Sequence, residues 1–261
     1  MSDLFDTLAR AIRAERAVAM ATVVSGPHVG SKLLVGESMD PLGSLGDADL
    51  DRVVTRDALG SLASGVTTVR TYGEHGEARE TAVRVFIESF SSPPRMLIFG
   101  AVDFTRALVE VAKVLGYRVT VCDAREVFAT RTRFPEADEV VRDWPHRFLE
   151  RVGQSLGALD AVCVLTHDPK FDVPAVIAAL QTDVGYLGAM GSRRTTDDRN
   201  RRLREEGVTD ADIARVMAPI GLDLGARTPE ETAVSICAEI IALRTGRTEG
   251  APLRDAAGPI H

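Results

Sequence analysis

Cysteine is scarce in this chain of 261 residues. The three cysteines, Cys122, Cys163 and Cys237, are odd in number and widely spaced, with no CxxC pair and no zinc-binding pattern. Cys122 and Cys163 fall in apolar segments that we expect to be strands, where a thiol packs as a small hydrophobic group. The cysteine content therefore argues against a disulfide framework and against a structural zinc site.

The sequence also lacks a surplus of positive charge and a long apolar run. Lys and Arg number 31 against 38 Asp and Glu, a formal net charge of −7. Without surplus cations to neutralise phosphates, general binding to nucleic acids or anionic membranes is disfavoured. No apolar run approaches the roughly 20 residues of a membrane span, and the charged, amphipathic N-terminus is unlike a signal peptide. We therefore expect a cytoplasmic protein that binds neither nucleic acid nor membranes.

The apolar pattern changes along the chain and predicts two domains. Residues 1–90 read as an N-terminal α+β domain of helices and hairpins. Residues 91–95, "SSPPR", predict a linker because two prolines interrupt regular structure. Residues 96–245 alternate short apolar strands with longer helices, which is typical of a parallel sheet covered on both faces. The Gly/Pro-rich residues 246–261 predict a disordered tail.

The strand–helix–strand unit that opens the second domain is typical of a Rossmann-like α/β fold, the fold class that we predict. Gly100 supplies the first glycine of the dinucleotide fingerprint G-x-G-x-x-G, but Val102 and Thr105 replace the other two. Asp103 places a carboxylate at the helix N-terminus, where it repels a phosphate. Asp123 stands near the usual position of a ribose-binding acid, although a strand-end turn explains it equally well. NAD(P) binding at this turn is therefore disfavoured.

Polar residues also follow the predicted strand "DAVCVL", in the segment "THDPKFD". Ligands of open α/β sheets bind beyond the carboxyl ends of the strands. His167 is a candidate general base or ligand-holding residue there, with Asp168 or Asp172 to orient it. Alternatively, the segment is a turn in which Asp172 caps the following helix.

The segment "GSRRT" follows the next predicted strand and favours an anion site. Ser192 is a natural helix N-cap, which makes Arg193 and Arg194 first-turn residues. Cations are unfavourable at that end of the helix dipole unless an anion lies between them and the helix. The alternative is that Asp197 and Asp198 pair with these arginines at helical spacing.

Arg227 precedes the predicted start of the last helix, and we expect it at the same sheet edge, where it joins the anion site. The segment "TPEE" predicts this helix start, with Thr228 as N-cap. No catalytic triad, G-x-S-x-G elbow, P-loop or metal cluster stands out. The sequence thus favours a binding protein over a catalyst.

Several segments, in order along the chain, resemble one family. They are "PPRMLIFGA", "GYRVTVCDAR", "FPEADEVV", "LTHDPKFDVPAV", "GYLGAMGSRR" and "APIGLDLGARTPEETAVSICAEI". The family is that of the xanthine dehydrogenase accessory factors and the related maturation proteins of carbon monoxide dehydrogenase. The resemblance runs roughly from Pro93 to Leu243. It is weaker before Ser91, where "GSLGDADLD" places Asp49 roughly at the position of a family cysteine.

This resemblance implies a cytoplasmic maturation factor for a molybdenum hydroxylase of the xanthine dehydrogenase type. Such a factor holds the molybdenum cofactor (molybdopterin), allows its sulfuration by a partner such as a cysteine desulfurase, and delivers it to the apo-enzyme. Because the cofactor carries a phosphate, the anion site suits it. The cofactor-binding residues that we predict are Asp123, His167, Asp168, Ser192, Arg193, Arg194 and Arg227. An NAD(P)-dependent oxidoreductase and a ligand-free interaction module remain alternatives, and a homodimer remains open.

Overall fold

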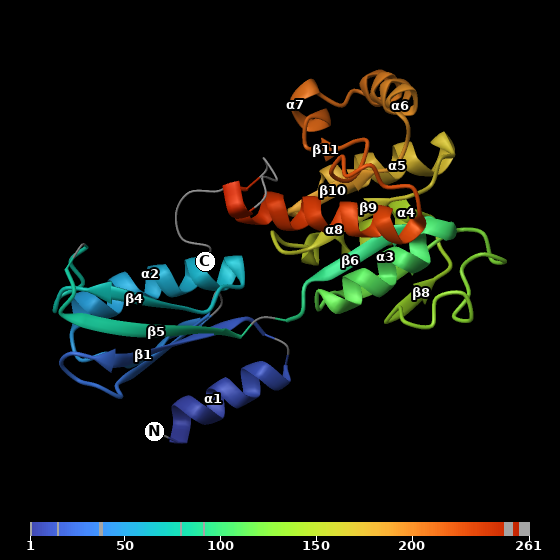
Figure 1. Cartoon of the computed structure of the whole chain (residues 1–261). Helices are drawn as coiled ribbons and strands as arrows, with labels where there is room; N and C mark the ends of the chain where they lie inside the picture. Colours follow the sequence, from blue (N-terminus) through green and yellow to red (C-terminus); the bar gives the residue numbers. More distant parts are fainter. Residues whose placement is uncertain are drawn as a thin grey trace. The chain divides into compact units, whose positions relative to one another are not determined.

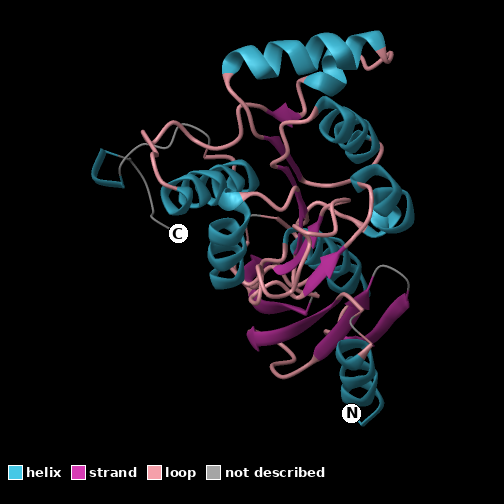
Figure 2. Ribbon diagram, turned by 90° about the vertical axis from the view of Figure 1, so that its right-hand side faces the viewer, coloured by secondary structure: helices cyan, strands magenta, loops and turns pink. Residues whose placement is uncertain are grey.

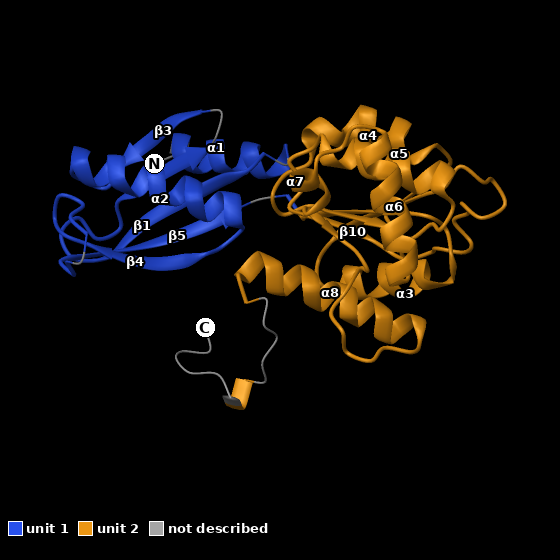
Figure 3. Cartoon of the chain, turned by 90° about the horizontal axis from the view of Figure 1, so that it is seen from above, with its two compact units in different colours: residues 1–92 blue, residues 93–261 orange. Residues whose placement is uncertain are grey.

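The computed structural model describes residues 2–14, 16–36, 39–78, 80–90, 92–247 and 253–255. The chain divides into two compact units, residues 1–92 and 93–261, each with its own hydrophobic core (Figure 3). The division falls within the segment that we predict as a linker, of which Ser91 lies outside the described residues.

The first unit is an antiparallel sheet with strand order β3-β2-β1-β5-β4 and one helix on each face (Figure 1). Alternate residues of β1 show this: Ala19 and Ala21 pack in the core beneath α2, whereas Val18 and Met20 pack against α1. Its elements are α1 (Ser2–Arg13), β1 (Val18–Ser25), β2 (Lys32–Gly36), β3 (Met39–Ser44), α2 (Ala48–Ser64), β4 (Thr68–Tyr72) and β5 (Val83–Phe90).

The sequence pattern does not predict strand β3, because its residues Pro41 and Gly43 are typical of turns. Both are tolerated in β3 because it is an edge strand, where one row of backbone groups needs no partner.

The second unit is a sheet of parallel strands in the order β11-β10-β9-β6-β7-β8. Numbered from its first strand, β6, this is the Rossmann order 3-2-1-4-5-6, so the predicted α/β fold class is confirmed. Its strands are β6 (Arg95–Phe99), β7 (Arg118–Cys122), β8 (Glu139–Val141), β9 (Ala161–Val164), β10 (Tyr186–Ala189) and β11 (Val216–Met217).

Helices cover both faces of this parallel sheet (Figures 1 and 2). In β6, Met96 and Ile98 pack with α3 and α8, whereas Leu97 and Phe99 pack with α4, α5 and α6. The helices are α3 (Asp103–Val114), α4 (Pro145–Val152), η1 (Gly153–Ser155), α5 (Pro169–Leu180), α6 (Arg193–Glu205), α7 (Asp210–Ile213) and α8 (Pro229–Thr245).

The end of the chain differs from the sequence pattern in one element. The apolar spacing of residues 210–217 is that of one helix, but α7 ends at Ile213 and Val216–Met217 forms β11 against β10. A strand of two residues is too short to show the alternation of apolar and polar residues by which a sequence predicts a strand. Most of the predicted tail lies outside the described residues; Gly246 caps α8, and Leu253–Asp255 forms the short 3-10 helix η2.

Among the described residues, no helix combines the length and the apolarity needed to cross a membrane.

Gly100 lies where the strand order reverses, between β6 and β9. Its φ is 110°, a left-handed region that favours glycine, and its N–H donates to the carbonyl oxygen of Cys122 at 3.0 Å. A Cβ at this position would lie 2.8 Å from the backbone nitrogen of Thr166. The exits of β6 and β9 are therefore in backbone contact, and a side chain at residue 100 would separate them.

We predict that Gly100→Ala destabilises the protein by roughly 1–3 kcal/mol, the cost of a strained backbone conformation. Chemical denaturation of the full chain measures this loss. Gly157→Ala is the matched control, because a Cβ at Gly157 meets open space. Equal losses for the two variants would contradict the assigned role of Gly100.

Candidate functional site

The turn after β6, where a dinucleotide phosphate would bind, is closed by its own side chains. The buried Thr105 hydroxyl donates to the carbonyl oxygen of Gly100 at 2.5 Å and accepts the Val102 N–H at 3.2 Å. Asp103, at the first position of α3, is almost fully exposed, with its carboxylate 4.0 Å from Arg133. The residues that replace the fingerprint glycines thus stabilise the turn from within.

Asp123 completes this closed turn. Its buried carboxylate accepts the backbone N–H of Ala101 at 2.8 Å and is bonded by the Arg125 guanidinium at 2.7 and 2.9 Å. Burial alone would raise the pKa of Asp123, but the hydrogen bonds from Arg125 and Ala101 hold that pKa below its ordinary value. The predicted ribose-binding acid therefore has its oxygens engaged by the protein itself.

The cavity beside this turn is too small for a nucleotide. It measures about 10 Å³ and is lined by Gly100, Asp123, Ala124, Arg125, Pro145, Thr166 and Phe171. A space of roughly 10–15 Å³ holds about one water molecule. The Phe171 ring packs on Trp144, with ring centroids 4.8 Å apart. This geometry does not support the oxidoreductase alternative.

The loop after β9 carries His167 and leads directly into α5. The N-cap of α5 is Asp168, whose carboxylate accepts the backbone N–H of Lys170 at 3.1 Å. The prediction that Asp172 caps this helix is wrong, because α5 begins earlier, at Pro169, and Asp172 lies buried in its first turn. His167 is exposed and forms no hydrogen bond with the described residues.

The loop after β10 leads into α6 and carries the two predicted arginines. Ser192 is the N-cap, and its Oγ accepts the backbone N–H of Thr195 at 3.2 Å. The exposed Arg193 and Arg194 form no ion pair with the described residues.

The expected pairing of Asp197 and Asp198 with these arginines is wrong. Asp198 pairs with Arg201 and Arg202 instead, at 2.5 and 3.0 Å. Asp197 forms no ion pair within the described part of the chain. The cations at the N-terminus of α6 are thus not neutralised by the carboxylates of their own helix.

Arg227 follows β11, at the start of α8. Its backbone N–H donates to Glu231, which also accepts the N–H of Thr228, so the predicted capping box is confirmed. Because β9, β10 and β11 are neighbours in the sheet, the loops that carry His167, Ser192 and Arg227 leave adjacent strands. No hydrogen bond or ion pair among the described residues links Arg227 to the other two loops. Asp123 follows β7 and belongs to the separate, closed turn.

Sequence reasoning missed a buried ion pair behind these loops. Arg199 Nε lies 3.1 Å from the Asp172 carboxylate, and the two side chains are 1% and 3% exposed. Arg199 lies on an arginine-rich helix and therefore resembles its exposed neighbours. The spacing along the helix could have revealed that Arg199 is buried. Thr196, Arg199 and Leu203 share one helical face, and all three are buried.

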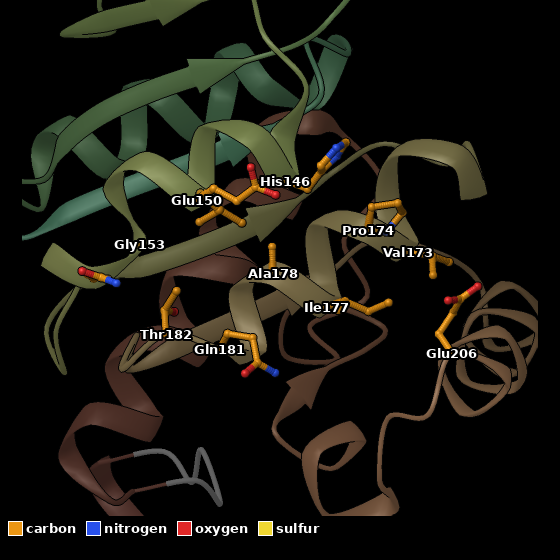
Figure 4. A pocket seen from close by; sticks show the side chains of 12 residues that line it. His146, Glu150, Gly153, Val173, Pro174, Ile177, Ala178, Gln181, Thr182 and Glu206 are labelled. Carbon is orange, nitrogen blue, oxygen red and sulfur yellow. The ribbon is translucent and has the colours of Figure 1, made fainter.

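A wider groove of about 570 Å³ runs along α4, η1 and α5 (Figure 4). His146 and Glu150 line it from α4, while Ile177 lines it from α5 and Gln181 from the C-cap of that helix. None of the predicted site residues lines this groove, so it is a feature separate from the loops that carry them.

In the first unit, the position of the expected family cysteine lies at the N-terminus of α2. Asp49 there is exposed and pairs with Arg52 at 3.2 Å. The three cysteines are buried residues of the second unit. Burial raises the pKa of Cys122 to about 12 and that of Cys237 to about 11, which suppresses the thiolate form. The structure thus presents an exposed carboxylate, and no exposed thiol, at this helix.

A histidine contact also anchors the N-terminus of α2. Asp47 caps this helix by accepting the Leu50 N–H at 2.9 Å, and its other oxygen lies 2.8 Å from Nδ1 of His75. The hydrogen bond with Asp47 raises the pKa of His75 above its ordinary 6.5. Hydrogen bonds from Leu50 and His75 lower the pKa of Asp47 below its ordinary 3.8.

This contact should make stability depend on pH. A raised pKa of His75 means that the contact stabilises the fold fully below the ordinary value of 6.5 and is lost as the pH rises through the raised value. The difference in unfolding free energy between the wild type and His75→Gln should therefore be larger at about pH 5.5 than at about pH 8.5. Urea denaturation at the two values measures this. Equal differences at the two pH values would contradict the role assigned to this contact.

Taken together, the strand order and the glycine turn after the first strand define a Rossmann-type domain, which follows a small α+β unit in the chain. Residues 96–240 match the family model of the XdhC Rossmann domain, and residues 11–73 match that of the XdhC and CoxI family. The first match alone covers more than half of the chain. The chain therefore belongs to this family of xanthine dehydrogenase accessory factors.

Curated relatives support the same assignment. The chain is 28% identical over 248 residues to the uncharacterized protein YqeB of Escherichia coli (strain K12), covering 89% of this chain and 44% of YqeB. It is 30% identical over 165 residues to a probable xanthine dehydrogenase subunit of Bacillus subtilis (strain 168), covering 63% and 47%. It is 35% identical over 89 residues to the molybdenum cofactor insertion chaperone PaoD of Escherichia coli (strain K12), covering 34% and 28%. The chain spans less than half the length of these relatives.

A solved structure shares the fold. The crystal structure of a xanthine dehydrogenase (BH1974) from Bacillus halodurans matches with a TM-score of 0.52 and 20% sequence identity, covering 95% of this chain and 97% of that one. At this identity the likeness supports the fold and no more.

Proposed function

We propose that this chain is a maturation factor for a molybdenum hydroxylase of the xanthine dehydrogenase type, and that it binds the molybdenum cofactor and delivers it to the apo-enzyme. The observation that carries the proposal is the match of residues 96–240 to the XdhC Rossmann domain. A relative named as a molybdenum cofactor insertion chaperone supports it. A cytoplasmic location and a cysteine desulfurase as second partner belong to the same proposal.

The residues at the N-terminus of α6 suit the phosphate of that cofactor. Hydroxyl groups of Ser192 and Thr195 lie 2.9 Å apart at this end of the helix, where free backbone N–H groups and the helix dipole favour an anion. Arg193 and Arg194 add two exposed cations that no carboxylate among the described residues neutralises. In the proposed site, the arginines bind the phosphate and the hydroxyl groups orient it.

The remaining predicted residues have supporting roles in the proposal. His167 and Asp168, on the neighbouring loop, contact the polar edge of the pterin, and Arg227 adds charge from the third loop. Asp123 supports the closed turn after β6. The bound cofactor supplies the molybdenum chemistry of the client enzyme. This chain holds and protects the cofactor, and its own residues perform no chemical step.

The structure does not suit a thiolate contact to the molybdenum. Asp49 occupies the expected cysteine position, and the three cysteines of the chain are buried. A carboxylate there does not supply the soft sulfur ligand of a thiolate. The proposed site therefore relies on the phosphate and the pterin rather than on a protein–metal bond.

We predict that the full chain, purified from cells that make the cofactor, releases a fluorescent pterin and molybdenum on denaturation. Arg193→Ala combined with Arg194→Ala should reduce the released pterin at least tenfold, because charge-assisted hydrogen bonds contribute roughly 1.5–3 kcal/mol each. Arg201→Ala is the matched control, since Arg201 lies on the same helix but is paired with Asp198 and Glu205.

Two outcomes would overturn the proposal. The first is a wild-type chain without pterin that also fails to bind a molybdenum hydroxylase in a pull-down. The second is strong thermal stabilisation by NADPH, which would favour an oxidoreductase instead; a ligand at 100 times its Kd adds about 2.7 kcal/mol.

A further inference from the structure

The buried pair Asp172–Arg199 connects the two strand exits of the proposed site. Asp172 lies in the first turn of α5, four residues after the N-cap Asp168, whose loop carries His167. Arg199 bonds Asp172 through Nε at 3.1 Å, and its Nη2 donates to the carbonyl oxygen of Met190 at 2.5 Å. Met190 is the last residue before the Gly191–Ser192 turn. One guanidinium thus joins the loop after β9 to the loop after β10.

The same guanidinium lies directly beneath the turn that begins α6. A Cβ added to Gly191 would lie 3.5 Å from Arg199 Nη2 and 3.0 Å from the Thr195 side chain. The guanidinium is therefore in van der Waals range of this turn, and the Thr195 side chain also lies close to it. Arg193 and Arg194 are the exposed cations of this turn, whereas Arg199 is buried at the middle of α6 and paired with Asp172.

Hydrogen bonding around the pair is incomplete. Arg199 Nη1, Asp172 Oδ1 and Thr196 Oγ1 are buried and have no hydrogen-bond partner among the described residues. Unpaired buried polar groups are unfavourable, and apolar residues of similar volume are often at least as stable as a buried ion pair. Stability alone therefore does not explain the pair. The geometry of the pair offers an explanation, because Arg199 holds the loop after β9 and the loop after β10 at a fixed distance from each other.

We infer that Arg199 is a positioning residue of the anion site at Ser192–Arg194, and that this site takes a phosphate monoester rather than a pyrophosphate. The pyrophosphate of a dinucleotide normally binds at the turn after the first strand, here β6, which the side chains of Thr105 and Asp123 already close. A single helix N-terminus with two exposed arginines, Arg193 and Arg194, unpaired within the described part of the chain, suits one doubly charged phosphate. The inference rests on the proposed function only in identifying that phosphate as part of the cofactor.

The test is a titration of the full chain with inorganic phosphate, followed by ³¹P NMR, with pyrophosphate as the competing probe. Arg199→Lys keeps the charge but replaces the planar guanidinium, which bonds Asp172 and Met190 through two different nitrogens, with a single nitrogen on a flexible stem. It should raise the Kd for phosphate about tenfold, because misplacing a binding group by about 1 Å weakens its interactions strongly. Asp172→Asn keeps the shape, removes the ion pair and should act in the same direction. Arg201→Lys, on the exposed face of the same helix, should leave the Kd unchanged.

Melting temperatures of the same variants separate positioning from general stability. A lowered melting temperature with an unchanged Kd for phosphate in both Arg199→Lys and Asp172→Asn would overturn the inference. So would the failure of the wild type to bind phosphate, or tighter binding of pyrophosphate than of phosphate. Phosphate binding that depends on Arg199, in a chain that copurifies with no pterin and binds no molybdenum hydroxylase in a pull-down, would support the inference and reject the proposed function.

Discussion

The parallel alignment of the strands in the second unit is the constraint on which the candidate site depends. Since every strand of this sheet runs in one direction, every strand exit lies at one edge, and the polar segments after β9, β10 and β11 become neighbours. Alternate residues of the strands are buried under helices on opposite faces, which leaves this edge as the place where loops can present polar groups. The charge of the loops at that edge then decides which ligand the fold can take.

Two strand exits of this edge have opposite properties. After β6, Thr105 and Asp123 engage the backbone of the turn, and no space remains for a nucleotide. After β10, Arg193 and Arg194 stand at a helix N-terminus without a carboxylate partner among the described residues. The Rossmann framework is thus retained while its usual phosphate position is filled, and the cations lie at another helix. This arrangement fits a phosphate-bearing cargo better than a dinucleotide.

The first unit adds a chemical limit. Its helix α2 begins with Asp47 as N-cap and carries Asp49 in the first turn, so the exposed group at the expected cysteine position is a carboxylate. A carboxylate does not supply the sulfur donor of a thiolate. In the proposed function, binding of a molybdenum cofactor therefore depends on its organic part. The proposed phosphate site and the buried pair Asp172–Arg199 behind it have the central role there.

The sequence by itself determined the fold class, the start of α6 at Ser192, the capping box at Thr228 and the family, because local spacing and short-range hydrogen bonds encode them. Only the tertiary structure decided which side chains from distant segments meet, because the spacing of residues along the chain does not encode such contacts. Asp172 resembled a helix cap and Arg199 a surface arginine, yet folding pairs them inside the protein, across 27 residues of chain. Strand β11 forms only because β10 offers it a partner. Local patterns report which residues share a helix or a strand; which side chains meet depends on how the sheet brings distant segments together.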